Sequence, residues 1–280
     1  MRYKLLLFLG LFCWSVQMAA YKQTLFVDEF QSEVKVQQRV LNLIRAGVLD
    51  GIIHTNRVKV IDALSVVPTP DYKSLEKARH HEATYLLKGK LLNRVATDDG
   101  ISDRPNHHSR DNSYKESFSL RLELIRTSDG TTIYSQNYEA KGSSSGRDAS
   151  QYNALRHALV SFPDEMRTFI EAHFKVYGAL VGLHNASKSR AKEVYINLGY
   201  DDPIREGLRF EVFLPQPITE ERSERKIGEI RIDNITGPSS SLCKVMRKGS
   251  EEILKAINQH KQLRIISRQA RLFDEIRDKR

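Results

Sequence analysis

The sequence contains little cysteine and little tryptophan. Its two cysteines are Cys13 and Cys243, and its one tryptophan is Trp14. Cys13 and Trp14 lie in an N-terminal segment that we expect to be removed, which leaves Cys243 alone. No internal disulfide can then form in the mature chain, although an exported protein enters an oxidising compartment. Cys243 lies in a strand-like run, Leu242–Met246, and is predicted to be a small buried apolar residue rather than a reactive thiol.

The sequence also lacks the motifs of common nucleotide-binding enzymes and hydrolases. It contains neither the phosphate loop G-x-x-x-x-G-K-[ST] nor the dinucleotide fingerprint G-x-G-x-x-G. A serine-nucleophile pattern, G-x-S-x-G, occurs at Ser144, but within a Ser/Gly run that is typical of a linker. Asp28, Glu29 and Asp62 follow strand-like segments, where carboxylates usually cap turns. We therefore predict no catalytic residue and a protein that is not an enzyme.

Two pairs of adjacent histidines invite a metal-binding interpretation: His80-His81 and His107-His108. Adjacent residues on a helix point about 100° apart, and no structural zinc spacing lies nearby. We therefore expect no bound metal and no cofactor. The alternative, a weak loop site, would use His107 and His108 with Asp98, Asp99 and Asp111.

Long apolar runs are absent after the N-terminal segment. Residues 1–20 combine a basic start, an apolar stretch over Leu5–Val16 and a small-residue exit. This pattern predicts a secretory signal peptide with cleavage near Ala20, because the apolar stretch is shorter than the ~20 residues of a spanning helix. Bulky Phe12 precedes Cys13, so lipid attachment at this cysteine is not predicted.

The basic residues are concentrated at the C-terminal end of a chain with a net charge of +9. Residues 261–280 hold seven Lys/Arg and three Asp/Glu. Arg271, Phe273 and Arg277 are candidate partner-binding residues on an amphipathic tail. In an exported protein such a tail favours anionic lipid, cell-wall polymer or an acidic partner over nucleic acid. A solvated tail, or one packed on its own domain, is the alternative.

The stretch Ala83–Gly142 is predicted to form three consecutive strands. Phe118, Leu120, Leu122 and Leu124 alternate with polar residues, which is the period of a strand with one buried face. Turn-forming residues 127–130 predict a hairpin. Further elements are expected on both sides: strands over 23–30 and 57–62, a helix from Ser32 that Asp50-Gly51 ends, a helix over 72–82, and helices up to Phe174 capped by Asp148 or Ser150.

Two polar segments are predicted to be irregular. Ala96–Tyr114 reads as a long exposed loop, and its His107, His108, Arg110 and Asp111 are candidate partner-binding residues. Residues 143–146 read as a flexible link.

From Lys175 onward, short strand-like runs alternate with Gly/Pro turns, which predicts a small β-barrel. Strands are expected over 176–183, 193–198, 208–214, 227–235, 241–246 and 262–266, with a helix over 251–259. The predicted fold class is therefore α/β (α+β). A signal peptide (1–20) precedes a mixed sheet with packed helices (21–174), which is followed by a small β-barrel domain with a basic tail (175–280).

The arrangement of these segments resembles a known family. Four segments of the first half are similar to the curli production assembly/transport component (CsgG) family. They are Leu25–Val27, Val58–Asp62, Ala83–Gly89 and Leu120–Ile125, and the last is followed by Asp129-Gly130. Three later segments resemble the small C-terminal barrel of the flagellar assembly T (FlgT) type protein: Tyr195–Gly199, Ile204–Val212 and Ile227–Ile230. The resemblance implies a bacterial envelope protein located in the periplasm or at the periplasmic face of the outer membrane.

The predicted function is that of an exported, non-catalytic cell-envelope protein. It would bind other envelope proteins in the assembly or regulation of an envelope structure, with a homo-oligomeric scaffold as one form. An outer-membrane secretion channel of the curli transport type is the first alternative, although the polar Ala96–Tyr114 segment lacks the alternating hydrophobicity of a lipid-facing hairpin. A periplasmic metal-dependent or hydrolytic enzyme is the second.

Overall fold

The structure, a computed structural model, describes residues 22–66, 73–98, 112–215 and 224–268. Internal contacts divide these residues into two compact units. The sheet unit holds Lys22–Val176 together with Pro203–Glu211 and residues 267–268, and the barrel unit holds Tyr177–Asp202 and Val212–Ile266. The predicted signal peptide lies outside the described residues.

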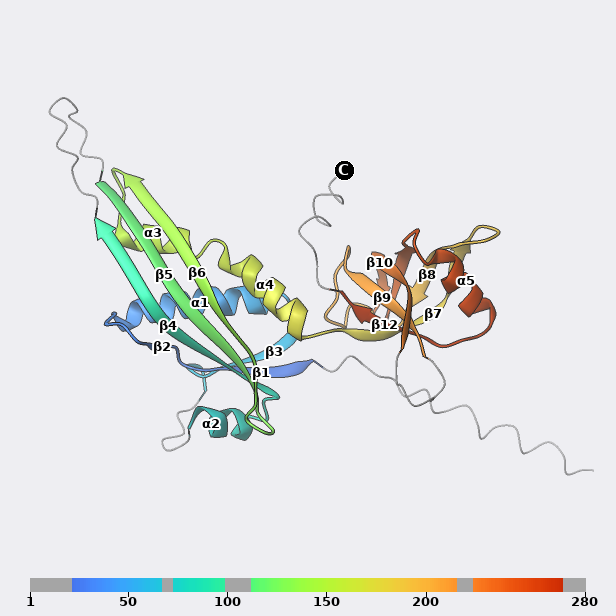
Figure 1. The fold of residues 1–280 in the computed structure, drawn as a ribbon, viewed down its shortest axis with the longest axis horizontal. Helices are drawn as coiled ribbons and strands as arrows, with labels where there is room; N and C mark the ends of the chain where they lie inside the picture. The colour runs from blue at the N-terminus through green and yellow to red at the C-terminus, as the bar shows by residue number, and fades with distance from the viewer. Residues whose placement is uncertain (1–21, 67–72, 99–111, 216–223, 269–280) are drawn as a thin grey trace, which may run out of the picture. The chain divides into compact units, whose positions relative to one another are not determined.

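The sheet unit contains a mixed β-sheet, as predicted (Figure 1). Its strands are β1 (Gln23–Val27), β2 (Gln31–Ser32), β3 (Val58–Asp62), β4 (Tyr85–Asp98), β5 (Asn112–Arg126) and β6 (Thr132–Gly146). Their order is β3-β1-β4-β5-β6, with β2 beside β4. β1 runs parallel to β3 and β4, whereas β4, β5 and β6 form an antiparallel ribbon. The prediction of three consecutive strands in this ribbon is confirmed.

Helices cover both faces of the sheet, as Figure 1 shows. They are α1 (Gln38–Ile53), α2 (Ser74–His80), α3 (Gln151–Ala158) and α4 (Phe162–His173). α1, α3 and α4 lie on one face, and α2 lies on the other. The predicted cap of α3 is confirmed, because the Oγ atom of Ser150 accepts a hydrogen bond of 3.1 Å from the backbone N–H of Asn153.

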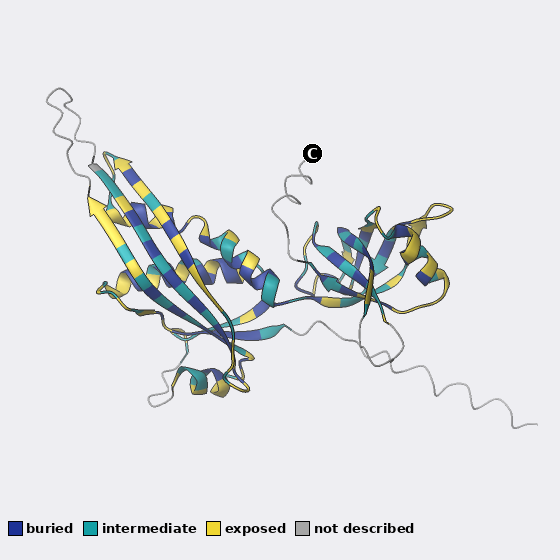
Figure 2. Ribbon diagram, viewed as in Figure 1, coloured by how far each residue is buried: buried dark blue, intermediate teal, exposed yellow. Residues whose placement is uncertain are grey.

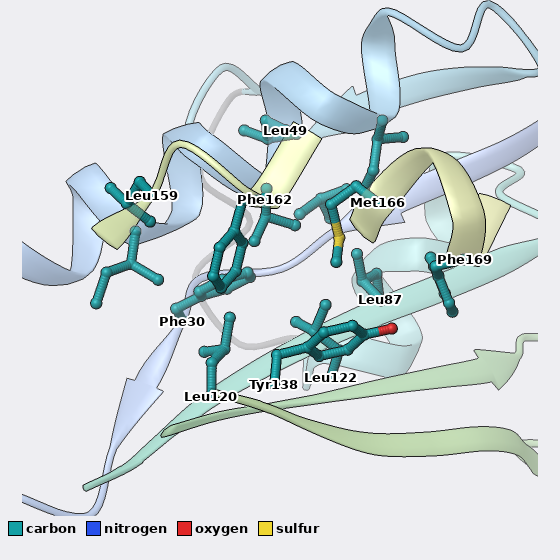
Figure 3. Packing of buried hydrophobic residues seen from close by; sticks show 14 of the residues in the cluster. Phe30, Leu49, Leu87, Leu120, Leu122, Tyr138, Leu159, Phe162, Met166 and Phe169 are labelled. Atoms are coloured by element: carbon teal, nitrogen blue, oxygen red, sulfur yellow. The ribbon is translucent and has the colours of Figure 1, made fainter. Parts of the chain in front are cut away.

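The main core of this unit lies between the sheet and α1, α3 and α4. Leu120, Leu122 and Leu124 of β5 are fully buried, and Figure 2 shows the alternation of buried and less buried residues along the ribbon. Figure 3 shows Phe162 and Met166 of α4 meeting the strand side chains in this layer. A smaller cluster with Phe26 and Ala78 fills the space under α2. Each large apolar side chain contributes about 1.5–3 kcal/mol on full burial.

The expectation that Asp50-Gly51 ends the first helix was wrong. α1 begins at Gln38 and continues through both residues to Ile53. A Cβ atom on Gly51 would lie 2.8 Å from Met166 Cβ and 2.8 Å from Pro163 Cα. The glycine therefore allows α4 to pack closely against α1, and it does not terminate the helix.

The interpretation of residues 143–146 as a flexible link was also wrong. β6 continues to Gly146 and pairs with β5 in an unbroken register from Tyr134 onward. A Cβ atom on Gly142 would collide with the backbone of Ala154 and Ala158 in α3. Gly142 therefore permits α3 to lie directly on the strand, and this tertiary packing overrides the low strand propensity of a Ser/Gly run.

The long polar loop predicted over Ala96–Tyr114 is shorter at both ends. β4 extends to Asp98 and β5 begins at Asn112, with Asp98 opposite Tyr114 in the ladder. Arg94 and Glu116 help to explain this extension, because Arg94 donates hydrogen bonds of 2.6 and 3.1 Å to the two carboxylate oxygens of Glu116. A bidentate pair between neighbouring strands stabilises pairing where apolar residues are few.

The barrel unit contains a closed six-stranded barrel with the strand order β10-β11-β8-β7-β12-β9, which confirms the predicted small barrel. The elements are β7 (Tyr177–Ala186), β8 (Ala191–Ile196), β9 (Arg209–Leu214), β10 (Arg225–Gly237), β11 (Ser240–Val245), α5 (Ser250–Asn258) and β12 (Leu263–Ser267). Its interior is filled by aliphatic side chains, including Val194, Val212 and Ile230.

Candidate functional site

None of the residues predicted to contact partners is placed by the structure. His107, His108, Arg110 and Asp111 lie outside the described residues. The same holds for the tail residues Arg271, Phe273 and Arg277. These assignments stay predictions, as do the roles of anionic lipid and cell-wall polymer.

Asp62, considered above as a strand-end carboxylate, has a structural role. Its Oδ1 atom accepts hydrogen bonds from Arg45 Nη2 at 2.5 Å and from the backbone N–H of Leu64 at 2.7 Å. Burial alone would raise the pKa of Asp62, but these hydrogen bonds and the charge of Arg45 together lower it. Asp62 thus closes the turn after β3 and joins it to α1.

The two side chains that resemble nucleophiles are also packed within the fold. Ser144 is buried on β6, and its Oγ atom accepts a hydrogen bond of 3.4 Å from the backbone N–H of Ser150. Cys243 is fully buried on β11, and burial together with the charge of Asp233 raises the pKa of its thiol to about 12. The predicted buried position of Cys243 is confirmed. A thiol with this pKa stays protonated at neutral pH and is a poor nucleophile.

The most distinctive exposed feature of the sheet unit is the free edge of β6. Within the described residues, β6 has a hydrogen-bonded neighbour, β5, on one side only. It is 15 residues long, whereas strands usually have about 5–6 residues. It contains no proline, and Glu139 and Lys141 are its charged residues. Natural edge strands are usually short, charged or interrupted by proline, so β6 remains open to pairing.

A groove of about 590 Å³ runs along this edge, between β6 and α4. Tyr134 and residues 136–139 form the strand wall, and the helix wall is formed by six α4 residues: Asp164, Glu165, Thr168, Phe169, Ala172 and His173. Gln136 and Thr168 are exposed, one on each wall. We call this feature the β6–α4 groove.

Aromatic rings form one end of the β6–α4 groove. The ring centroid of Tyr134 lies 5.2 Å from that of Phe169 and 4.2 Å from that of His173, and the last two rings are 5.1 Å apart. Tyr138 follows Tyr134 on the same face of β6, and the two hydroxyl oxygens are 3.4 Å apart. Tyr138 and Phe169 reach into the core (Figure 3), whereas Tyr134 and His173 are only partly buried.

Burial changes the ionisation of groups along the groove. It raises the pKa of the Glu165 carboxyl, although a hydrogen bond from Ser161 opposes this. Burial, and then the charge of Lys175, lowers the pKa of His173, which is therefore neutral at pH 7. Burial and the hydrogen bond to Tyr134 raise the pKa of Tyr138. Glu165 is thus an ionisable acid in a partly desolvated position on the helix wall of the groove.

The sequence alone does not identify the groove residues. Tyr134 and Tyr138 are four residues apart on one strand face, and Phe169 and His173 are four apart on one helix face. Each spacing is an ordinary core pattern. Only the tertiary packing of α4 on β6 brings the two pairs together.

Among the described residues, no group of three or more His, Cys, Asp or Glu side chains is placed to hold a metal ion. His81 instead stacks on Phe26 with ring centroids 5.7 Å apart. None of the helices in the described ranges is both long and apolar enough to cross a membrane.

Comparison with known proteins gives only distant likenesses. No family model matches the chain, and no curated protein matches it significantly. The PelC dodecamer from Paraburkholderia phytofirmans is 14% identical and covers 51% of this chain and 86% of its own, with a TM-score of 0.33. A lipoprotein from Neisseria meningitidis is 11% identical over 51% of this chain and 97% of its own, with a TM-score of 0.33.

A third similar structure is the LpoB C-terminal domain from Escherichia coli. It is 13% identical over 43% of this chain and 83% of its own, with a TM-score of 0.27. At these identities and TM-scores the likenesses carry no argument about function, and the resemblance to the curli transport and flagellar families stays a prediction.

Proposed function

We propose that this chain is an exported, non-catalytic cell-envelope protein that binds other proteins, and that it does so through the free edge of β6 and the β6–α4 groove. Binding would take part in the assembly or regulation of an envelope structure. The proposal of export rests on the signal-peptide pattern of residues 1–20. The proposal that the protein is not an enzyme is supported by the structural roles of Asp62, Ser144 and Cys243.

The observation that carries the proposal is the open edge of β6 with a groove beside it. An extended peptide can add a strand to an exposed sheet edge, where main-chain hydrogen bonds supply affinity. Alternate side chains of the added strand then point to the same face. On one face they would enter the β6–α4 groove, which supplies pockets that distinguish one partner from another.

Self-association through the same edge is a form of this proposal. Two copies could pair along β6, or one copy could contribute an extended segment to the next. The absolute mass of the protein, measured by light scattering on a sizing column, separates an oligomeric scaffold from a monomeric adaptor. A monomer would restrict the proposal to partners of a different sequence.

Site-specific photo-crosslinking in cells that produce the chain tests the proposed function. A photoreactive benzoylphenylalanine replaces Gln136 on the strand wall or Thr168 on the helix wall, both of which are exposed. Lys59 on β3 serves as the control, because it is an exposed residue on the opposite edge strand of the same sheet.

We expect adducts from Gln136 and Thr168 that map by mass spectrometry to one segment of one protein, with none from Lys59. A segment of this chain itself would identify the partner as a second copy. Adducts of equal yield from all three positions, or none from the groove, would refute the proposed binding surface.

A further inference from the structure

We propose that the β6–α4 groove selects an extended segment that carries an arginine or lysine side chain, whose cation faces the carboxylate of Glu165 within the aromatic lining of the groove. This inference rests on the proposed function, since it specifies the partner of the same site. The partner is an extended stretch of another protein.

The charge of the groove supports this partner. The chain has 44 Lys and Arg against 35 Asp and Glu, for a net charge of +9. The groove departs from this composition, because Glu139, Asp164 and Glu165 line it and its lining includes neither lysine nor arginine. Asp164 is partly balanced by Arg167 at 3.2 Å. An acidic groove on a basic protein is complementary to a cationic side chain and disfavours an acidic one.

Glu165 supplies a second observation. Its carboxylate is half-buried, and burial raises its pKa. None of the basic residues described by the structure forms an ion pair with it; Ser161 donates a hydrogen bond to it, and, after burial, its charge helps to raise the pKa of Tyr138. A partly desolvated carboxylate without a cation is unfavourable in the free protein. A cation brought by a bound segment would compensate this charge.

The aromatic rings provide the rest of the site. Tyr134 and His173 are partly exposed and line the same groove as Glu165, with their ring centroids 4.2 Å apart. After burial and Tyr134, the charge of Glu165 also raises the pKa of Tyr138, whose hydroxyl oxygen lies 3.4 Å from that of Tyr134. Phe169 lies behind both rings and is buried. Cations are attracted to the faces of aromatic rings, and the attraction grows when water is excluded. The imidazole of His173 is neutral at pH 7, but the charge of Lys175 acts on that ring, so the cation is expected on the Glu165 side of the groove.

The position of Gln136 allows a matched pair of test variants. Gln136 is exposed on the strand wall, between Tyr134 and Tyr138. Gln136→Glu and Gln136→Lys have side chains of similar length and opposite charge. Simple strand addition that ignores charge predicts equal effects of the two variants. Recognition of a cation predicts that Gln136→Lys weakens binding and that Gln136→Glu keeps or strengthens it.

The experiment selects peptides from a displayed random nonapeptide library on the full chain. The best peptides are then synthesised with each Arg or Lys kept or replaced by Gln, and their affinities for the wild type and both Gln136 variants are measured by fluorescence anisotropy. We expect one enriched Arg or Lys position, a loss of about tenfold on its replacement by Gln, and a similar loss with Gln136→Lys. Affinity should also fall with added salt.

The possible failures separate the two proposals. Peptides that lose affinity with both Gln136 variants but show no preference for Arg or Lys would refute the cation site and leave the proposed binding edge standing. Peptides that bind equally to the wild type and both variants would likewise refute the cation site alone, whereas a library that yields no binder would refute both. Circular dichroism of the two variants, which should match the wild type, guards against unfolding as the cause.

Discussion

Replacing Gly142 by alanine tests whether β6 continues through the Ser/Gly run and supports α3. The added Cβ atom would collide with backbone atoms of Ala154 and Ala158, and its distance to Ala158 Cα would be 2.9 Å. These are backbone atoms of a helix, so relief requires α3 to shift as a whole. The helix is itself packed into the core through Leu155, so a shift would disturb buried contacts.

The expected size of the effect follows from this geometry. Overpacking a tightly packed site usually costs about 1–3 kcal/mol. A cost of about 2 kcal/mol corresponds to a shift of about 1 M in the urea midpoint when the slope is about 2 kcal/mol/M. If the strand ended at Gly142 and residues 143–146 were a flexible link with no helix packed on them, the same substitution would change stability by only a few tenths of a kcal/mol. The sequence interpretation and the structure therefore predict different results.

The assay combines urea denaturation with amide hydrogen exchange. Exchange reports on α3 and β6 individually, which matters because the two compact units can unfold separately. We expect Gly142→Ala to lower protection in α3 and at the end of β6, and Ser145→Ala, an exposed position on the same strand, to leave both unchanged. Unchanged protection in Gly142→Ala would show that α3 does not lie on this part of β6.

Three further predictions concern ionisable groups. Arg94→Ala should lower the free energy of unfolding in urea by about 3 kcal/mol, because the Glu116 carboxylate, whose side chain is 0% exposed, then lacks its partner. Replacing both Arg94 and Glu116 by Met should restore most of this stability. No recovery in the double variant would contradict the explanation. Burial raises the pKa of Glu165 above its unfolded value, so ionised Glu165 lowers the stability of the folded state at pH 7. This loss of stability disappears as the pH falls through the folded pKa and the carboxylate becomes protonated. Glu165→Gln should thus raise the urea midpoint at pH 7 but not at acidic pH, and an equal effect at both would exclude this cause. Cys243, with a pKa of about 12, should react with iodoacetamide at pH 8 only after denaturation, as followed by mass spectrometry; rapid labelling of the folded chain would contradict its burial.

Local pattern was enough to predict much of the fold. The alternation of Leu120, Leu122 and Leu124 identified β5, the middle strand of the antiparallel ribbon, and the closely spaced strands after Lys175 identified the barrel. Both signals come from periodicity and turn residues within one segment. The errors arose where a local preference was overridden by a distant contact. At Gly51 and Gly142 a neighbouring helix packs so closely that a side chain would not fit. From the sequence alone, such glycines indicate the end of a helix or strand.

The candidate site could not be predicted in the same way. Its parts, Tyr134 on β6 and Phe169, His173 and Glu165 on α4, are separated in sequence and carry no catalytic motif. A free sheet edge is a property of strand order, which the sequence does not state. The absence of proline and the few charges of β6 become informative only when β6 is known to be the last strand of the sheet.

The central claim, that β6 accepts an added strand, is tested most directly by residue-resolved amide exchange on the chain with and without a saturating selected peptide. We expect increased protection at every second amide along β6 from Tyr134 onward, since an added strand pairs with alternate residues of the edge. β3, the opposite edge of the sheet, should be unchanged. Protection that appears elsewhere while β6 exchanges as before would contradict the claim.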